Sequence, residues 1–197
     1  MFVINSNIEN EIVINKSRFI CLLIKVNNEA FINKYLDEIK NTYKDATHYC
    51  YSYIIGNTKR FNDDGEPGGT AGMPILNVLE NNELTNILCV VVRYFGGIKL
   101  GTGGLVRAYT NAVTSCLTNV KLNKLIDGKN LTIKFNYDKV KYIDNILKEI
   151  KIINKTFDNE IIYSFDISND SYNQIISNLE NNTNDINIID NIKIEEI

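Results

Sequence analysis

The chain contains few of the residues from which metal and nucleophilic centres are usually built. Its 197 residues include no tryptophan, one histidine (His48) and four cysteines (Cys21, Cys50, Cys89 and Cys116). The cysteines are widely spaced, form no Cys-x-x-Cys pair and lie in apolar or aromatic stretches. This usage is typical of buried, reduced thiols, and a zinc site would have too few ligands at usable spacing. We therefore expect no metal and no cofactor.

Long hydrophobic segments are also absent from the sequence. No run of about 18 uncharged apolar residues occurs. The first ten residues contain neither a basic segment nor an apolar run of signal-peptide length. With 44% hydrophobic and 23% charged residues, the composition is that of an ordinary globular protein. We expect a cytoplasmic protein with no membrane partner.

Positive charge is not in excess, and it is unevenly distributed. Residues 1–125 carry 13 Lys and Arg against 11 Asp and Glu, a formal charge of +2, whereas residues 126–197 carry 8 against 13, a formal charge of −5. Neither part is basic enough to indicate a nucleic-acid binder by bulk charge. Contact with a polyanion must therefore depend on a local patch, and we expect no DNA sequence specificity.

Glycine and proline are scarce except in one window. Nine of the eleven glycines and both prolines lie between Gly65 and Gly104, in the blocks Asp63–Pro74 and Arg93–Arg107. Glycine permits close approaches and backbone conformations that other residues resist, and proline removes a backbone donor. A functional site is therefore expected in this window first.

Hydrophobic periodicity divides the chain into two domains, residues 1–126 and 127–197, joined by a polar segment at 121–129. The first domain is predicted to be α/β, with strands at 11–16, 18–26, 46–55 and 87–92 and helices at 27–43, 71–81 and from 104. The continuous apolar run 87–92 predicts a central strand buried on both faces. The second domain is predicted to have strands at 131–137, 152–157, 161–167 and 186–194 and helices at 138–150 and 171–181. This βαββαβ order predicts a ferredoxin-like domain, and the fold class is α+β.

The second glycine block combines the end of a strand, a flexible loop and the start of a helix. Free N–H groups at a helix start, glycines and nearby cations have the geometry of an anion site. The candidate phosphate- or nucleic-acid-binding residues are Arg93, Gly96, Gly97, Lys99, Gly101, Gly103, Gly104 and Arg107, with Lys16 and Arg18 beside them. Thr102 stands where a P-loop needs lysine, which argues against a nucleotide hydrolase. The alternative is a tight strand-to-helix turn in which Arg93 pairs with a carboxylate.

The first glycine block places three carboxylates, Asp63, Asp64 and Glu66, on a turn. With His48, such a cluster could act as acid and base or bind a divalent cation, as in a small-substrate hydrolase or a metal-dependent enzyme. The alternatives are ion pairing to arginine and capping of the helix after Ala71. His48 lacks the context of a serine or cysteine nucleophile, which favours a structural histidine.

A row of tyrosines occupies one face of the strand predicted at 46–55. Alternation places Tyr49, Tyr51 and Tyr53 on one face and His48 on the other. On an open sheet such tyrosines can stack on RNA bases, whereas under a helix they contribute to the core. We favour packing under a helix.

The motifs together resemble the YigZ/IMPACT family, in its bacterial YigZ-type branch. The resemblance rests on five stretches: Lys16–Phe19, Ala46–His48, Asp63–Pro67, Gly69–Gly72 with Pro74, and Val92–Tyr109. It implies an N-terminal domain similar to the second domain of a small-subunit ribosomal protein and to domain IV of elongation factor G. It also implies a ferredoxin-like C-terminal domain similar to domain V of that factor.

The resemblance further implies a role in translation, because eukaryotic members of the family are linked to translational control under stress through protein partners. The expected function is a translation-associated regulator whose partner is RNA, the ribosome or another protein. Because residues 127–197 are acidic, the N-terminal domain or a protein partner is expected to make that contact. An enzyme using Asp63, Asp64, Glu66 and His48 and a pure protein-interaction module are the alternatives, and the residues favour a protein without catalytic activity.

Overall fold

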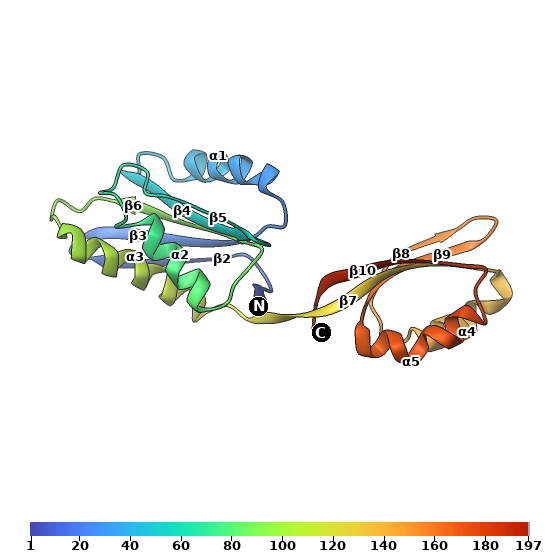
Figure 1. Cartoon of the computed structure of the whole chain (residues 1–197). Helices are drawn as coiled ribbons and strands as arrows, with labels where there is room; N and C mark the ends of the chain where they lie inside the picture. Colours follow the sequence, from blue (N-terminus) through green and yellow to red (C-terminus); the bar gives the residue numbers. More distant parts are fainter. Residues whose placement is uncertain (197) are drawn as a thin grey trace. The chain divides into compact units, whose positions relative to one another are not determined.

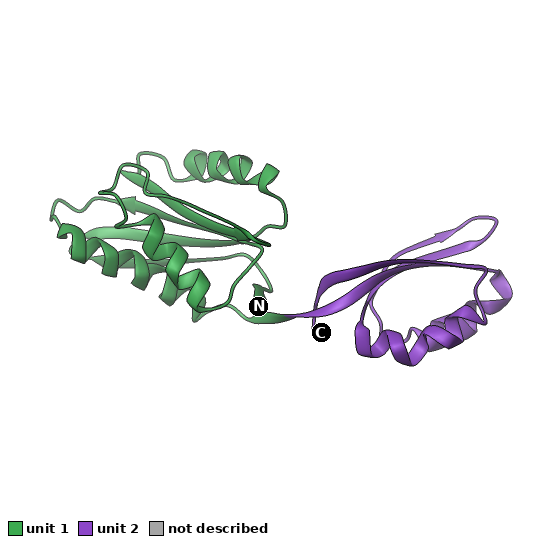
Figure 2. Cartoon of the chain, in the orientation of Figure 1, with its two compact units in different colours: residues 1–124 green, residues 125–197 purple. Residues whose placement is uncertain are grey.

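The structure is a computed structural model that describes residues 1–196 and divides into two compact units, residues 1–124 and 125–197 (Figure 2). The dividing point lies within strand β7 (Leu122–Phe135), whose first three residues belong to the first unit. The boundary predicted after residue 126 lies in the same strand. No helix among residues 1–196 combines the length and the hydropathy needed to cross a bilayer.

The first unit is built on a five-stranded antiparallel sheet with the order β2-β3-β6-β4-β5. Its strands are β2 (Ile8–Ile14), β3 (Ser17–Lys25), β4 (His48–Ile55), β5 (Thr58–Asn62) and β6 (Ile87–Tyr94). Seven of the eight residues of the middle strand β6 are buried, as its apolar run predicted. The edge strand β5 was not predicted, because most of its residues are polar and exposed. The short strand β1 (Phe2–Ile4) pairs with the first residues of β7.

Helices cover both faces of this sheet (Figure 1). The helix α1 (Ile32–Thr42), preceded by the short helix η1 (Glu29–Phe31), lies on one face, and α2 (Gly72–Asn81) and α3 (Gly101–Leu117) lie on the other. Successive residues of β6 alternate between the two cores: Val90 packs on the α1 side and Val91 on the α2–α3 side. The three tyrosines of β4 also pack on the α1 side, which confirms that they lie under a helix.

The second unit is a ferredoxin-like domain, as predicted. The remainder of β7 is followed by η2 (Tyr137–Lys139), α4 (Val140–Ile146), β8 (Ile152–Phe157), β9 (Ile161–Ser168), α5 (Asn169–Glu180) and β10 (Asp185–Glu195). The antiparallel strands have the order β10-β7-β9-β8, and α4 and α5 pack on one face. The two units meet within the polar joint predicted at 121–129, but most of this segment is a strand, β7, which was not predicted there. Its polar side chains do not prevent backbone pairing with β10.

Candidate functional site

The two glycine blocks of the sequence meet at a buried ion pair between Glu66 and Arg93. Arg93 is near the end of β6, and Glu66 is on the loop between β5 and α2. Arg93 Nη1 donates to Glu66 Oε1 at 2.5 Å, and the two side chains are only 6% and 3% exposed. The hydroxyl of Tyr109, on α3, donates to the same carboxylate oxygen at 2.8 Å. The guanidinium carbon lies 5.4 and 5.5 Å from the ring centroids of Phe19 and Phe95.

This arrangement changes the role expected for Arg93. Its guanidinium is not at the surface, whereas Lys99 and Arg107 are exposed. The Nε atom of Arg93 is buried and has no hydrogen-bond partner in the part of the chain that the structure describes. A phosphate could reach this guanidinium only if the ion pair with Glu66 were broken, which would leave a buried charge uncompensated. Arg93 therefore joins the two glycine blocks through its ion pair with Glu66. This is the second of the two roles considered from the sequence, in which Arg93 pairs with a carboxylate.

Asp63 caps the start of α2. Its carboxylate accepts three backbone N–H bonds of 2.8 to 3.0 Å, from Gly69, Ala71 and Gly72. Backbone donors at a helix start have no partner within the helix, and an aspartate at this place satisfies them. The capping alternative therefore describes Asp63.

His48 lies beside both Asp64 and Glu66. Asp64 Oδ2 accepts from the backbone N–H of Tyr49 at 2.6 Å. His48 Nδ1 donates to the carbonyl oxygen of Asp64 at 2.8 Å, and His48 Nε2 lies 3.9 Å from Glu66 Oε1. Among residues 1–196, no group of three or more His, Cys, Asp and Glu side chains is arranged to hold a metal ion. Asp63, Glu66 and one carboxylate oxygen of Asp64 are thus occupied by contacts within the chain.

Two ionisable groups beside the ion pair have raised pKa values. Burial is the main cause for Tyr109, whose pKa lies far above its ordinary value, and the neighbouring Cys50 and Glu66 add to the shift. Burial likewise raises the pKa of the Cys50 thiol to about 12, with a further contribution from the Glu66 carboxylate. Both groups therefore stay protonated, and Cys50 is not available as a thiolate nucleophile.

We expect the four cysteines of the native protein to resist iodoacetamide at mildly alkaline pH. All four are buried, and an exposed thiol with an ordinary pKa of about 8.5 would react under these conditions. Mass spectrometry of labelled protein with and without urea measures the difference. Rapid labelling of Cys50 in the native protein would contradict this expectation.

The loop between β6 and α3 is held in place by a close contact at Gly96. A Cβ atom at Gly96 would lie 2.0 Å from the carbonyl carbon of Lys16, so only glycine fits. The Gly96 N–H donates to Ser17 Oγ at 3.1 Å. Lys16 belongs to the two-residue turn between β2 and β3, and its side chain is exposed. The contact therefore places Lys16 beside the loop that carries Lys99.

The start of α3 has no cap of the kind that closes α2. Among the described residues, no side chain accepts a hydrogen bond there, and the first turn contains no acidic residue. Arg107 lies one turn further on, with Nη1 3.8 Å from the position that a Cβ atom of Gly103 would occupy. Exposed glycines, uncapped N–H groups and cations therefore occur together. We call these residues the α3 loop surface: Lys16, Gly97, Lys99, Gly101, Gly103 and Arg107.

Two features of the site were missed in the sequence. The apolar stripe of the predicted helix placed Tyr109 in the core, but its hydrogen bond to Glu66 was not predicted. The signal was available, because a buried tyrosine hydroxyl usually needs a partner. A pocket under α1 was also missed. Its signal was the helical spacing of three polar residues, Asn33, Asp37 and Lys40, on one side of the predicted helix.

Both glycine blocks lie within a region of the chain that matches a known protein family. Residues 15–117 match the family model described as the Impact N-terminal domain. The chain is 40% identical over 174 residues to the IMPACT family member YvyE of Bacillus subtilis (strain 168), which covers 87% of this chain and 78% of that protein. It is 35% identical over 151 residues to the IMPACT family member YigZ of Escherichia coli (strain K12), with 73% and 74% covered.

A solved structure has a similar fold. A crystal structure described as that of a hypothetical protein matches this chain with a TM-score of 0.64 and 26% sequence identity, covering 96% of each chain. The family model spans more than half of this chain, from the β2–β3 turn to the end of α3. The chain therefore belongs to the IMPACT family.

Proposed function

We propose that this chain is a translation-associated regulator that binds RNA phosphate at the α3 loop surface. The observation that carries the proposal is the uncapped start of α3 beside exposed Lys99 and Arg107. A helix start attracts phosphate because its N–H groups lack partners and its dipole favours negative charge. In α2 and α5 the corresponding donors are satisfied by Asp63 and Ser168.

Exposed apolar side chains near these cations favour RNA over a free phosphate compound. Phe95 is 45% exposed and Ile98 is 44% exposed, and both lie on the loop that carries Lys99. Single-stranded nucleic acids bind to surfaces that combine backbone cations with aromatic rings on which bases stack. Membership of the IMPACT family, whose eukaryotic members are linked to translational control, supports the translational part of the proposal.

The double variant Lys99→Ala/Arg107→Ala is expected to bind a single-stranded RNA oligonucleotide about tenfold more weakly than the wild type at moderate salt. The slope of log affinity against log salt should also be shallower by about 1.4, because each of the two lost phosphate contacts contributes about 0.7 to that slope on a single strand. Fluorescence anisotropy across a salt series measures both quantities.

A matched control removes the same charge elsewhere. Lys34 and Lys148 are exposed lysines outside the α3 loop surface, with side chains 69% and 68% exposed, and the double variant Lys34→Ala/Lys148→Ala should bind RNA as the wild type does. If both double variants weaken binding equally, bulk charge is responsible and the surface is not. Absence of salt-dependent RNA binding by the wild type would refute the proposal.

A further inference from the structure

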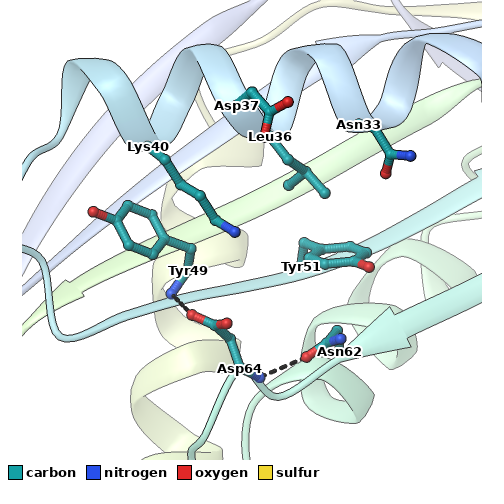
Figure 3. Close-up of a pocket in the computed structure, with 8 residues that line it drawn as sticks. All are labelled: Asn33, Leu36, Asp37, Lys40, Tyr49, Tyr51, Asn62 and Asp64. Atoms are coloured by element: carbon teal, nitrogen blue, oxygen red, sulfur yellow. Dashed lines mark hydrogen bonds between the residues drawn. The ribbon is translucent and has the colours of Figure 1, made fainter.

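A pocket of about 390 Å³ lies on the other face of the same sheet, beneath α1 (Figure 3). One wall is α1, and the other walls are β4 and the turn that follows β5. The residues that line it are Asn33, Leu36, Asp37, Lys40, Tyr49, Tyr51, Asn62 and Asp64. This volume lies in the range of sites for small molecules, about 300–1,000 Å³.

Opposite charges line this pocket without pairing with each other. Within residues 1–196, the ammonium of Lys40 makes no ion pair, and its contact is the ring of Tyr49, whose centroid lies 5.9 Å away. Asp37 makes neither a hydrogen bond nor an ion pair within those residues. Figure 3 shows the Lys40 side chain directed from α1 toward the strands, with the Asp64 carboxylate on the strand side of the pocket. A ligand that carries both charges could therefore pair with both walls at once.

The Asp64 carboxylate is held in place by its own turn. The residue has a positive φ of 43°, which aspartate tolerates better than most side chains do. Its backbone N–H donates to Asn62 Oδ1 at 2.7 Å, and its Oδ2 accepts from the Tyr49 N–H at 2.6 Å. These bonds leave Asp64 Oδ1 without a partner in the described part of the chain. That oxygen can accept a hydrogen bond from a ligand without rearrangement of the turn.

The balance of charge argues against a phosphorylated ligand here. The lining contains two carboxylates, Asp37 and Asp64, and one ammonium, Lys40, so a group with only negative charge would meet net repulsion. A ligand with one positive and one negative group meets attraction from both sides. The rings of Tyr49 and Tyr51 add apolar surface on the floor of the pocket, against which a side chain can pack.

We propose that this pocket binds a free α-amino acid. Lys40 binds the α-carboxylate, Asp64 binds the α-ammonium, and Tyr51 contacts the ligand side chain. The amides of Asn33 and Asn62 offer further donors and acceptors beside these groups. The site uses residues and a sheet face different from those of the α3 loop surface, so the two proposals can fail independently.

Isothermal titration calorimetry of the full chain with each standard L-amino acid at millimolar concentration tests the proposal. We expect saturable binding of at least one amino acid. The corresponding amino-acid amide lacks the carboxylate, and the N-acetyl derivative lacks the ammonium. Each should bind about tenfold more weakly or not at all, because a hydrogen bond between charged groups contributes at least that factor.

Two variants test the assigned residues. Lys40→Gln and Asp64→Asn should each weaken binding of the amino acid by about tenfold or more. Lys34→Gln is the matched control, because Lys34 is on the same helix, is exposed and pairs with Glu38 at 3.8 Å. Thermal unfolding followed by circular dichroism shows whether each variant is folded. Lys40→Gln leaves the hydrogen bonds of the Asp64 turn unchanged, so it tests the pocket even if Asp64→Asn does not fold.

Three results would overturn the proposal. The first is that no standard amino acid binds the wild type at millimolar concentration. The second is that binding survives both Lys40→Gln and Asp64→Asn in folded protein. The third is that nucleosides bind in this pocket and amino acids do not, which would identify Tyr51 as a stacking surface for a base. RNA affinity of Lys40→Gln should equal that of the wild type, which separates this site from the α3 loop surface.

Discussion

Replacement of Glu66 by alanine is expected to lower the free energy of unfolding by about 3–5 kcal/mol, measured by urea denaturation. The substitution leaves the guanidinium of Arg93 buried without its carboxylate and removes the acceptor of the Tyr109 hydroxyl. An uncompensated buried charge is costly because the interior cannot replace the water that the charge has lost.

Two further variants show whether the loss comes from the buried pair. Glu149→Ala removes a carboxylate whose side chain is 86% exposed and should change the free energy of unfolding by less than about 0.5 kcal/mol. The double variant Glu66→Leu/Arg93→Met removes both charges and should regain much of the stability lost in Glu66→Ala. A loss below about 1 kcal/mol for Glu66→Ala would contradict the pairing described here.

Because Arg93 is part of the buried ion pair, its substitution is a poor test of RNA binding. Arg93→Ala leaves the Glu66 carboxylate buried and unpaired, so reduced RNA binding by that variant would report a change in folding as well as in contact. Lys99 and Arg107 are exposed, and their removal changes the surface without uncovering a buried charge. They therefore give the cleaner test of the proposed function.

The variant Gly96→Ala is expected to lower the free energy of unfolding by about 3 kcal/mol or more. The added Cβ would lie 2.0 Å from the carbonyl carbon of Lys16, 2.1 Å from its oxygen and 2.4 Å from the nitrogen of Ser17. These are backbone atoms of the hairpin between β2 and β3, so relief requires the loop or the hairpin to move. Urea denaturation measures the loss, and the displaced loop should also weaken RNA binding.

Gly68→Ala is the matched control for this clash. No atom lies within 4 Å of a Cβ at Gly68, and its φ is not in the positive range that disfavours alanine. The free energy of unfolding should therefore change by less than about 0.5 kcal/mol. If both variants lost the same free energy of unfolding, the loss in Gly96→Ala would not come from the clash of its Cβ atom with the hairpin.

Local sequence patterns predicted much of the fold. The apolar run 87–92 predicted a buried central strand, which is β6, and the alternation of 131–137 and 161–167 predicted strands of the ferredoxin-like domain. Such patterns are local because a period of two or of 3.6 residues is visible within one element. The segment 121–129 was predicted as the joint between the domains but not as a strand, because its polar residues pair through the backbone, which leaves no hydrophobic signal.

The α3 loop surface was predicted in part. The order of strand, loop and helix is as predicted, with Lys99 on the loop and Arg107 on the helix. The helix α3 begins at Gly101 and not at 104, so Gly101 and Gly103 lie in its first turn. The pattern could not assign the partner of Arg93, for which phosphate and carboxylate were both compatible with the residues. The answer depends on Glu66, which is 27 residues away in the sequence and is brought to Arg93 by the pairing of β4 with β5 and β6.

By itself, the sequence determined the order of most helices and strands and the fold class, because periodicity is a property of short segments. The resemblance of its motifs to those of known proteins indicated the family. Only the tertiary structure decided which charges are buried together, which are exposed beside the start of α3, and that a pocket lies beneath α1. These features depend on contacts between segments that are distant in the chain. A local pattern, such as the polar spacing of Asn33, Asp37 and Lys40, supplies at most one side of them.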